Sequence, residues 1–332
     1  MDNIKQQHEL EALVGNFSSV ANTAIEIEKL SACAKTGDKD ATIRVIAALM
    51  RVATIDPGAT MCVLDAITRG HLGAEAASLI TPPAQSAMLA NLSEPASLPS
   101  DFWVAFWAFI NPNSSEPLSG DEVTAQVASL MSHLGERFLK CAEAASLAHP
   151  GTANAANRSM PPKLTLETLE ALPIGSLGNE YYRLIVDNDF HLEVLDRENI
   201  GFDNAKPALQ YLNLRILQMH DVWHIVGGYR TTILQEVGIS SFSLAQFNHN
   251  YSAMLITTAA VSALKNSPEA FGLAMQIISE GWLHGRTTPY FMDIEWENVW
   301  HLPVSEIHAR FGIKPFTSIF PADLIEQLGN VA

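Results

Sequence analysis

The sequence predicts an all-α fold, a bundle of many helices in a single domain. Apolar side chains recur at helical spacing along most of the chain. Strand signals are few, because alternating β-branched runs bounded by Asn-Gly or Asp-Gly turns are absent, so hairpins are not expected. Apolar residues make up 48% and charged residues 17% of the 332 residues, which supplies a sizeable core and excludes disorder of the whole chain.

The charge balance limits the partners that the chain can bind. Lys and Arg number 20 against 36 Asp and Glu, which gives a formal net charge of −16. Nucleic acid is therefore not an expected partner, since neutralisation of phosphates by basic side chains dominates that affinity. Retention on anionic lipid by a polybasic patch is disfavoured in the same way, so any membrane contact would have to be apolar.

Cysteine usage and the start of the chain indicate a reducing, cytoplasmic setting. Cys33, Cys62 and Cys141 are far apart and form no CxxC pair, which disfavours a disulfide framework and a cysteine zinc site. Residues 1–9 lack the features of a signal or transit peptide. No run reaches the roughly 18 to 20 apolar residues needed to span a bilayer, the longest candidate being Tyr251–Leu264.

Most of the sequence is expected to be helical. Thr42–Thr54 is predicted to be a helix that ends at Asp56-Pro57-Gly58. Ala59–Thr68 begins the next helix, and Asp121–Ala148 is expected to be one long helical stretch. The apolar stripe of the first helix consists of Ile43, Ile46, Ala47 and Met50.

Two segments rich in Pro, Gly, Asn and Ser are predicted to be loops, namely Asn111–Gly120 and His149–Pro162. The second loop divides the chain into two regions. Residues 1–162 form an N-terminal helical region with insertions, and residues 163–332 form a core helical region.

The segment Phe102–Ile110 is strongly aromatic and contains Trp103 and Trp107. We interpret it as a core helix or a dimer contact. The alternative is a monotopic anchor in a lipid interface, which no flanking Lys or Arg supports.

The segment Met219–Glu236 carries the most informative pattern. Leu209–Met219 contains no Gly or Pro and predicts one helix. His220 and His224 are four residues apart and lie on one face of that helix, and Asp221 borders the same face. A single metal ion could be bound by all three side chains.

A second helix is expected to bring a further carboxylate to this face. Gly227 and Gly228 end the first helix, and Thr232 with Gln235 has capping-box spacing for the next. A sharp turn would return Glu236 to the histidine pair. The prediction is a metal site between two consecutive helices, with two imidazoles and two carboxylates that suit zinc, iron, manganese or cobalt.

Two other interpretations of this pattern stay open. Histidines at this spacing also occur by chance, with one packed and one solvated. The His-Asp pair is also similar to that of the HD phosphohydrolases, for which His191 and Asp293 would have to supply further ligands. An unrelated helical metal hydrolase is the corresponding function.

The pattern His220-Asp221-x-x-His224, followed by eleven residues and Glu236, resembles the signature of the coenzyme Q biosynthesis family Coq-four. The segments Leu172–Tyr182 and Ile294–Trp300 also resemble segments of that family, as do Pro303 and Phe311–Ile313. The resemblance covers about residues 165–315. Residues 70–165 diverge from it, and Gly227-Gly228-Tyr229 replaces its usual Gly-Leu-Pro.

The resemblance implies a function in ubiquinone biosynthesis. The residues His220, Asp221, His224 and Glu236 would hold a divalent metal ion, with zinc expected and iron or manganese as alternatives. The implied reaction is the oxidative decarboxylation of a polyprenylated 4-hydroxybenzoate-type precursor, in which a hydroxyl replaces the carboxylate at ring carbon one. This makes the protein a metal-dependent decarboxylase (lyase) or oxidoreductase.

The alternative is a non-catalytic lipid-binding scaffold that organises the quinone-biosynthesis enzymes. Other enzymes of the pathway are expected partners in either case, as is a second copy of the chain in a homodimer. A peripheral position at the inner face of the cytoplasmic membrane would give access to the prenyl lipid.

Three side chains are candidate substrate contacts. Trp223 could stack on a ring or pack against a neighbouring helix. Tyr251 begins the apolar stretch Tyr251–Leu264, which could line a channel for the isoprenoid tail or pack in the core. Arg286 could bind the leaving carboxylate with its fork of donors, or form a surface ion pair.

Overall fold

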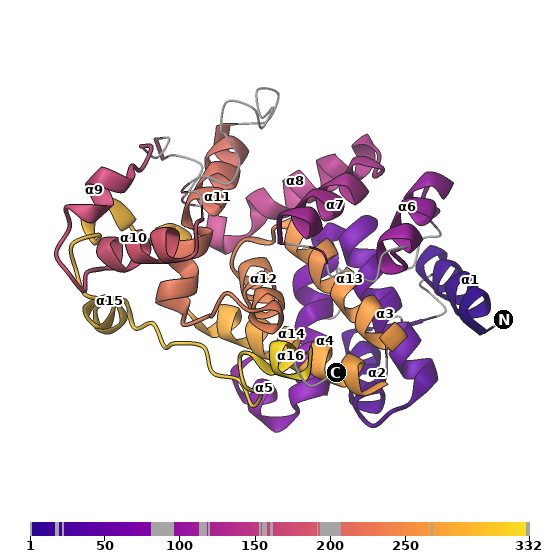
Figure 1. Cartoon of the computed structure of the whole chain (residues 1–332). Coiled ribbons are helices and arrows are strands. Elements are labelled where there is room, and N and C mark those ends of the chain that lie inside the picture. Colours follow the sequence, from indigo (N-terminus) through magenta and orange to yellow (C-terminus); the bar gives the residue numbers. More distant parts are fainter. Residues whose placement is uncertain are drawn as a thin grey trace. The chain divides into compact units, whose positions relative to one another are not determined.

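The computed structural model describes residues 2–16, 20–21, 23–80, 96–112, 118, 120–152, 154, 158–159, 162–190, 192, 207–266 and 268–329 (Figure 1). Within these ranges the regular structure is helical, and β structure is limited to an isolated antiparallel bridge between Ser176 and Pro303. The predicted all-α, multi-helix domain is therefore confirmed.

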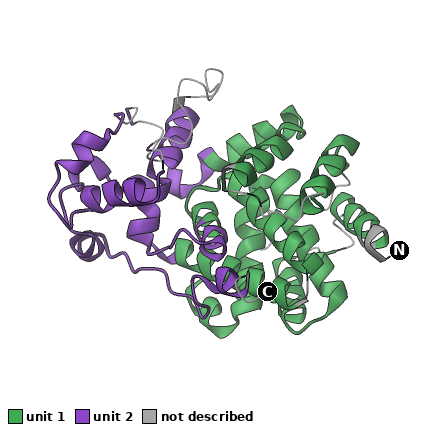
Figure 2. Cartoon of the chain, in the orientation of Figure 1, with its two compact units in different colours: residues 1–146, 240–286 green, residues 147–239, 287–332 purple. Residues whose placement is uncertain are grey.

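The helices gather into two compact units, each built from two separate stretches of chain (Figure 2). Unit 1 comprises residues 1–146 and 240–286, and unit 2 comprises residues 147–239 and 287–332. The predicted division into regions 1–162 and 163–332 stays a prediction about domain organisation.

Unit 1 begins with a group of helices packed around α3. The helices α1, α2 and α13 all contact α3, and α2 also packs along α4. Gly70 on α4 lies so close to the backbone of Glu28 on α2 that a Cβ atom would overlap its carbonyl oxygen. The elements are α1 (Asp2–Gly15), α2 (Ala24–Lys35), α3 (Lys39–Thr54), η2 (Pro57–Ala59), α4 (Thr60–Leu72), α5 (Ala74–Leu79), α6 (Ser100–Ile110), α7 (Gly120–Ser132), α8 (Glu136–Ala148), α13 (Asn250–Asn266) and α14 (Pro268–Thr287).

The predicted helix over residues 42–54 is present as α3 and begins three residues earlier. The Asp38 side chain caps it by accepting a hydrogen bond of 2.9 Å from the backbone N–H of Ala41. Ile46 and Met50 of the predicted stripe are fully buried. As expected, Pro57 ends the helical run and starts a short 3-10 turn before α4.

The expected long helix over residues 121–148 is instead two helices, α7 and α8. The break falls at residues 133–135, where Gly135 weakens a continuous helix through its backbone freedom. His133 leaves the helical path, and its Nδ1 lies 3.2 Å from a carboxylate oxygen of Asp101. Most of the predicted loop over residues 111–120 lies outside the described residues, as does part of residues 149–162.

The aromatic segment forms α6. Phe102, Phe106 and Ile110 on one face are buried in unit 1, as the core-helix interpretation expects. Val104 on another face is 71% exposed. Lipid contact by that face stays an untested alternative.

Among the described helices, none is by itself long and apolar enough to cross a membrane. One bent pair, Lys39–Thr54 with Pro57–Leu72, passes by length and composition with a bend of 118°.

Unit 2 is built around the long helix α11. The helices α10 and α15 contact it, and α9 packs on α10. Ser176 caps α10, and the backbone N–H groups of Leu177 and Gly178 donate to the carbonyls of Leu302 and Trp300 at 2.8 and 2.9 Å. The elements are η4 (Pro150–Thr152), α9 (Leu166–Glu170), α10 (Leu177–Asp187), α11 (Pro207–Gly227), the first turns of α12 (Ile233–Phe247), η7 (Phe291–Asp293), η8 (Trp296–Asn298), α15 (Val304–Phe311) and α16 (Leu324–Gly329).

Candidate metal centre

Two successive helices of unit 2 carry the donor residues that the sequence indicates. On α11, His220 and His224 lie one turn apart, with ring centroids 4.8 Å from each other. Glu236 lies in the first turn of α12. One donor atom from each of the three side chains lies within 4.8 Å of the others, so the turn between the helices returns Glu236 to the histidine pair.

The carboxylate of Glu236 lies close to both imidazoles. Its Oε1 is 3.3 Å from Nε2 of His224, and its Oε2 is 3.9 Å from Nε2 of His220. Both histidines therefore direct the same ring nitrogen toward one carboxylate. This arrangement suits a single ion bound by nitrogen and oxygen donors.

Asp221 has a different place from the other three residues. It is not part of the group whose donors converge, and its Oδ1 lies 3.2 Å from Nδ1 of His220. A carboxylate at this nitrogen favours the tautomer that protonates Nδ1 and leaves Nε2 free to bind a metal. The structure thus places Asp221 behind the ring of His220.

Opposite charges stabilise each other at this point. Burial lowers the pKa of His220, but the hydrogen bond to Asp221 and the charge of Glu236 outweigh burial and raise that pKa above its usual value. Burial raises the pKa of Glu236, but the adjacent His224 and His220 outweigh it, so that pKa is lowered. The surroundings of Glu236 therefore favour its ionised carboxylate next to a positively charged partner.

The surroundings of the His224 ring indicate whether these residues fit a metal ion. Its side chain is only 2% exposed, and neither of its ring nitrogens makes a hydrogen bond within the described part of the chain. Nε2 faces Oε1 of Glu236 at 3.3 Å without forming a hydrogen bond. A buried polar atom without a hydrogen bond costs free energy, and a metal ion bound by both atoms would remove that cost. Two imidazoles and a carboxylate are ligands found in both zinc and non-haem iron sites, so the residues fit a divalent transition metal.

The turn between the two helices is held by the C-terminal segment of unit 2. Gly228 has a φ of +77°, and its backbone lies against Pro315. The N–H of Phe316 donates to the carbonyl of Gly227 at 2.7 Å, and the Phe316 ring stacks on Tyr229 with centroids 4.3 Å apart. Gly227 and Gly228 end α11 as predicted.

The predicted capping box at the start of α12 does not form. The hydroxyl of Thr232 donates instead to the carbonyl of Ala322 at 2.7 Å. The Gln235 side chain accepts from the backbone N–H of Arg230 at 2.6 Å. The bond from Thr232 to a distant segment and the bond from Arg230 of the preceding turn to Gln235 replace the local cap.

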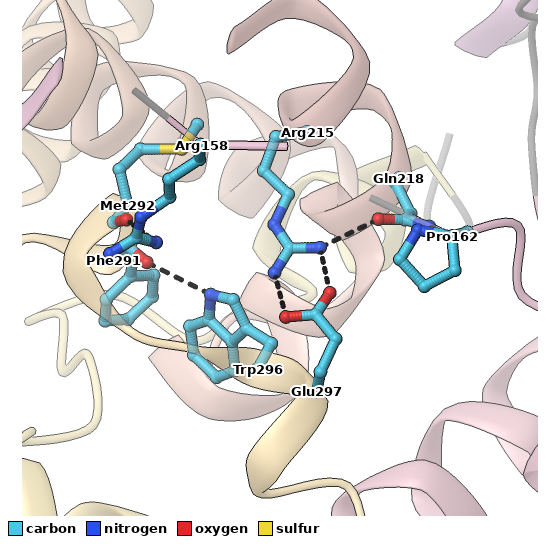
Figure 3. A network of polar contacts seen from close by, with 8 residues as sticks. All are labelled: Arg158, Pro162, Arg215, Gln218, Phe291, Met292, Trp296 and Glu297. Atoms are coloured by element: carbon cyan, nitrogen blue, oxygen red, sulfur yellow. Dashed lines mark hydrogen bonds and ion pairs between the residues drawn. The ribbon is translucent and has the colours of Figure 1, made fainter. Parts of the chain in front are cut away.

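A polar network anchors α11 upstream of the histidines (Figure 3). The buried Arg215 donates through both terminal nitrogens to the carboxylate of Glu297, at 2.7 and 2.9 Å, and also to Gln218 at 2.9 Å. Gln218 in turn donates to the carbonyl of Pro162 at 2.6 Å. The network therefore ties α11, which carries the two histidines, to segments far away in the sequence.

A cavity of about 340 Å³ adjoins the candidate centre in unit 2. Its lining includes the ligand candidate His224 together with apolar and polar side chains of α10 and of the turn. The remaining lining residues are Leu184, Ile225, Tyr229, Arg230, Thr231 and Thr232. The segment between His224 and Glu236 was predicted only as a turn, and Arg230 was not predicted as a site residue. The available signal was its position as a cation between the two donor residues.

The three candidate substrate contacts lie in different places. Trp223 is fully buried in unit 2, with its ring centroid 6.2 Å from that of Phe291. Tyr251 belongs to unit 1, where its hydroxyl lies 3.2 Å from that of Thr124. Their roles toward a substrate stay predictions.

Arg286 also belongs to unit 1, where Asp65 binds its guanidinium. The Nε and Nη2 atoms donate to the two carboxylate oxygens at 3.0 and 3.3 Å. Asp65 is buried and also accepts a hydrogen bond of 2.7 Å from Trp282. The pair is therefore largely buried, and a role of Arg286 toward a substrate stays a prediction.

The residues nominated for an HD phosphohydrolase do not complete the site within the described residues. His191 lies outside those residues. Asp293 is exposed, and its side chain accepts a hydrogen bond from Asn154. It is not part of the three-residue donor group.

The fold and the site together define an all-α protein with a candidate centre of two imidazoles and a carboxylate on consecutive helices. Residues 103–317 match the family described as "Coenzyme Q (ubiquinone) biosynthesis protein Coq4". The match covers more than half of the chain, and the chain belongs to this family. The resemblance identified from the motif is thereby confirmed.

Curated relatives agree with this assignment. The chain is 28% identical over 160 residues to the mitochondrial ubiquinone biosynthesis protein COQ4 homolog of Mus musculus, covering 46% of this chain and 55% of that protein. It is 29% identical over 169 residues to the Danio rerio homolog, covering 50% of this chain and 58% of that protein. The chain thus spans about half the length of the curated relatives it matches.

One solved structure is also similar, that of a protein from Nostoc punctiforme PCC 73102 provisionally assigned to ubiquinone biosynthesis. The identity is 26%, the TM-score is 0.48, and the match covers 64% of this chain and 96% of that one.

Proposed function

We propose that this Coq4 family member is a metal-dependent enzyme of ubiquinone biosynthesis. The proposed reaction removes the carboxylate from ring carbon one of a polyprenylated 4-hydroxybenzoate-type precursor and places a hydroxyl there. The observation that supports the proposal is the convergence of donor atoms from His220, His224 and Glu236, with the buried Nε2 of His224 facing the Glu236 carboxylate at 3.3 Å without a hydrogen bond.

Each residue of the centre has a separate role in this proposal. His220 and His224 would donate Nε2, and Glu236 would donate a carboxylate oxygen, to a divalent ion. Asp221 would orient His220 through Nδ1, which revises its predicted role as a direct ligand. The bound cation would stabilise the negative charge that develops when the carboxylate leaves.

The net reaction is a two-electron oxidation of the ring carbon. The carboxyl group leaves as carbon dioxide and a hydroxyl from water takes its place. Dioxygen accepts the two electrons and two protons and leaves as hydrogen peroxide, so atoms and electrons balance. Dioxygen is therefore the proposed co-substrate.

The test is turnover of a precursor labelled with ¹³C in its carboxyl group, by protein reconstituted with zinc, iron(II) or manganese(II) in air. The account predicts release of labelled carbon dioxide and a ring hydroxyl, both abolished by Glu236→Gln. The control is Glu306→Gln, an exposed carboxylate on α15, which should leave turnover unchanged.

The same variants separate an enzyme from a scaffold. A non-catalytic scaffold that binds prenyl lipid and pathway enzymes would release no labelled carbon dioxide, and Glu236→Gln would leave its binding largely intact. Zinc remains the ion we expect. A homodimer at the surface of the membrane, in contact with other quinone-biosynthesis enzymes, is part of the proposal.

A further inference from the structure

The cavity beside His224 is lined by both apolar and polar residues. Leu184, Ile225 and Tyr229 supply apolar and aromatic surface, and Arg230 supplies the positive charge among the lining residues. A volume of about 340 Å³ is near the lower end for small-molecule sites. The space therefore suits a ring-sized headgroup, and a long tail would extend out of it.

The backbone fixes Arg230 at this place. The ring of the preceding residue, Tyr229, stacks on that of Phe316. The backbone N–H of Arg230 donates to the side-chain oxygen of Gln235 on α12 at 2.6 Å. Since α12 also carries Glu236, the turn holds Arg230 in a constant relation to the candidate centre.

Among the described residues, no carboxylate forms an ion pair with the guanidinium of Arg230. Arg230 is exposed, and none of the acidic groups in the part of the chain that the structure describes forms an ion pair with it. Arg286 differs in this respect, because Asp65 accepts from two of its nitrogens. The five donors of Arg230 are therefore available to an anion that enters the cavity.

We propose that Arg230 is a specificity-determining residue that binds the carboxylate of an aromatic acid whose ring lies in this cavity. An arginine fork matches the two oxygens of a carboxylate, and its charge offsets the repulsion from Glu236. The anion site is independent of any metal, but the identity of the acid as a 4-hydroxybenzoate rests on the proposed function.

This placement also favours release of the product. A product that has lost its carboxylate no longer has the group that Arg230 binds. The acid is therefore expected to bind more tightly than the corresponding phenol, and the difference depends on Arg230.

The experiment is isothermal titration of the metal-free and metal-loaded full-length protein. The two ligands are 3-geranyl-4-hydroxybenzoate and 2-geranylphenol, which differ only in the carboxylate. The variants are Arg230→Gln and Arg230→Lys. The matched control is Arg310→Gln, an exposed arginine on α15 of the same unit.

Arg230→Gln should weaken binding of the acid at least tenfold and change binding of the phenol less than twofold, because a hydrogen bond to a charged group is lost. The affinity of Arg230→Lys for the acid should fall between that of the wild type and that of Arg230→Gln. Arg310→Gln should bind the acid like the wild type. Equal weakening of both ligands, an unchanged affinity for the acid, or no binding of the acid to the wild type would overturn the proposal. Arg230-dependent binding without carbon dioxide release would uphold the anion site and contradict the proposed reaction.

Discussion

Nε2 of His224 lies 3.3 Å from Oε1 of Glu236, although the two residues belong to successive helices separated by a turn. His224 is almost fully buried and Glu236 is about half-exposed. The contact therefore lies at the boundary between the core of unit 2 and its surface. A donor group at such a boundary can hold an ion and still admit a ligand from solvent.

Asp221→Asn should weaken metal binding without unfolding the protein. The amide cannot accept from Nδ1 of His220 with the strength of a carboxylate, so His220 loses its preferred tautomer. We expect the affinity for zinc to fall about 10- to 100-fold, against complete loss in His224→Ala. Competition with a chromophoric chelator measures this, and an Asp221→Asn protein that binds zinc like the wild type would contradict the orienting role.

Glu297→Gln should destabilise the fold. The variant removes the negative charge that pairs with the guanidinium of Arg215, a buried residue of α11 that donates to both carboxylate oxygens of Glu297. Because Glu297 is 41% exposed, solvent screens the pair and the expected loss is about 1 to 2 kcal/mol. Urea unfolding measures the loss, and Glu306→Gln is the control that should stay within about 0.5 kcal/mol of the wild type. Equal midpoints for the two variants would argue against the network.

Gly228→Ala should cost more stability than Gly312→Ala. Both glycines have positive φ values, +77° and +70°, so alanine is strained at either position by about 1 kcal/mol. A Cβ at Gly228 would in addition lie 2.8 Å from Cβ of Pro315, whereas at Gly312 nothing lies within 4 Å. Thermal unfolding should therefore give the lower midpoint for Gly228→Ala. The same loss in both variants would show that Pro315 does not constrain the turn.

Stability should fall as the pH is lowered from 6.5 toward 4. Burial, followed by the charge of Lys35, lowers the pKa of His71 from 6.5 to about 4. Between these values the unfolded chain binds a proton that the folded chain does not, so the free energy of unfolding decreases with falling pH, by up to about 3 kcal/mol for this group.

His71→Gln should make this slope shallower. The slope should not vanish, because the pKa of His249 is also lowered to about 4 by burial. Urea titrations at several pH values measure the slope. A His71→Gln protein with the same slope as the wild type would exclude His71 as its source.

The sequence predicted the parts of the fold that depend on local spacing. The stripe of α3, the end of α11 at Gly227 and the return of Glu236 all follow from periodicity and glycine. It failed where distant groups decide the outcome. The contact of His133 with Asp101 at the break over residues 133–135, and the hydrogen bond from Thr232 to Ala322, both involve segments far away in the chain.

The candidate site shows the same division. His220, His224 and Glu236 were visible as a motif, but the position of Asp221 behind His220 depends on side-chain geometry that spacing does not encode. The partner of Arg215 could not be deduced either, since Glu297 is far away in the chain. The available signal was that Arg215 lies in an apolar helical stretch with no nearby acidic residue, which indicates a partner from elsewhere in the chain.

The most direct test of the account is the metal content of the purified protein after reconstitution with zinc or iron(II) and removal of excess metal. Elemental analysis would compare the wild type with His224→Ala, and with His301→Ala as a control at an exposed histidine of the same unit. The account predicts about one equivalent of metal in the wild type and in His301→Ala and none in His224→Ala. A wild type without metal, or a His224→Ala protein that retains it, would contradict the central claim.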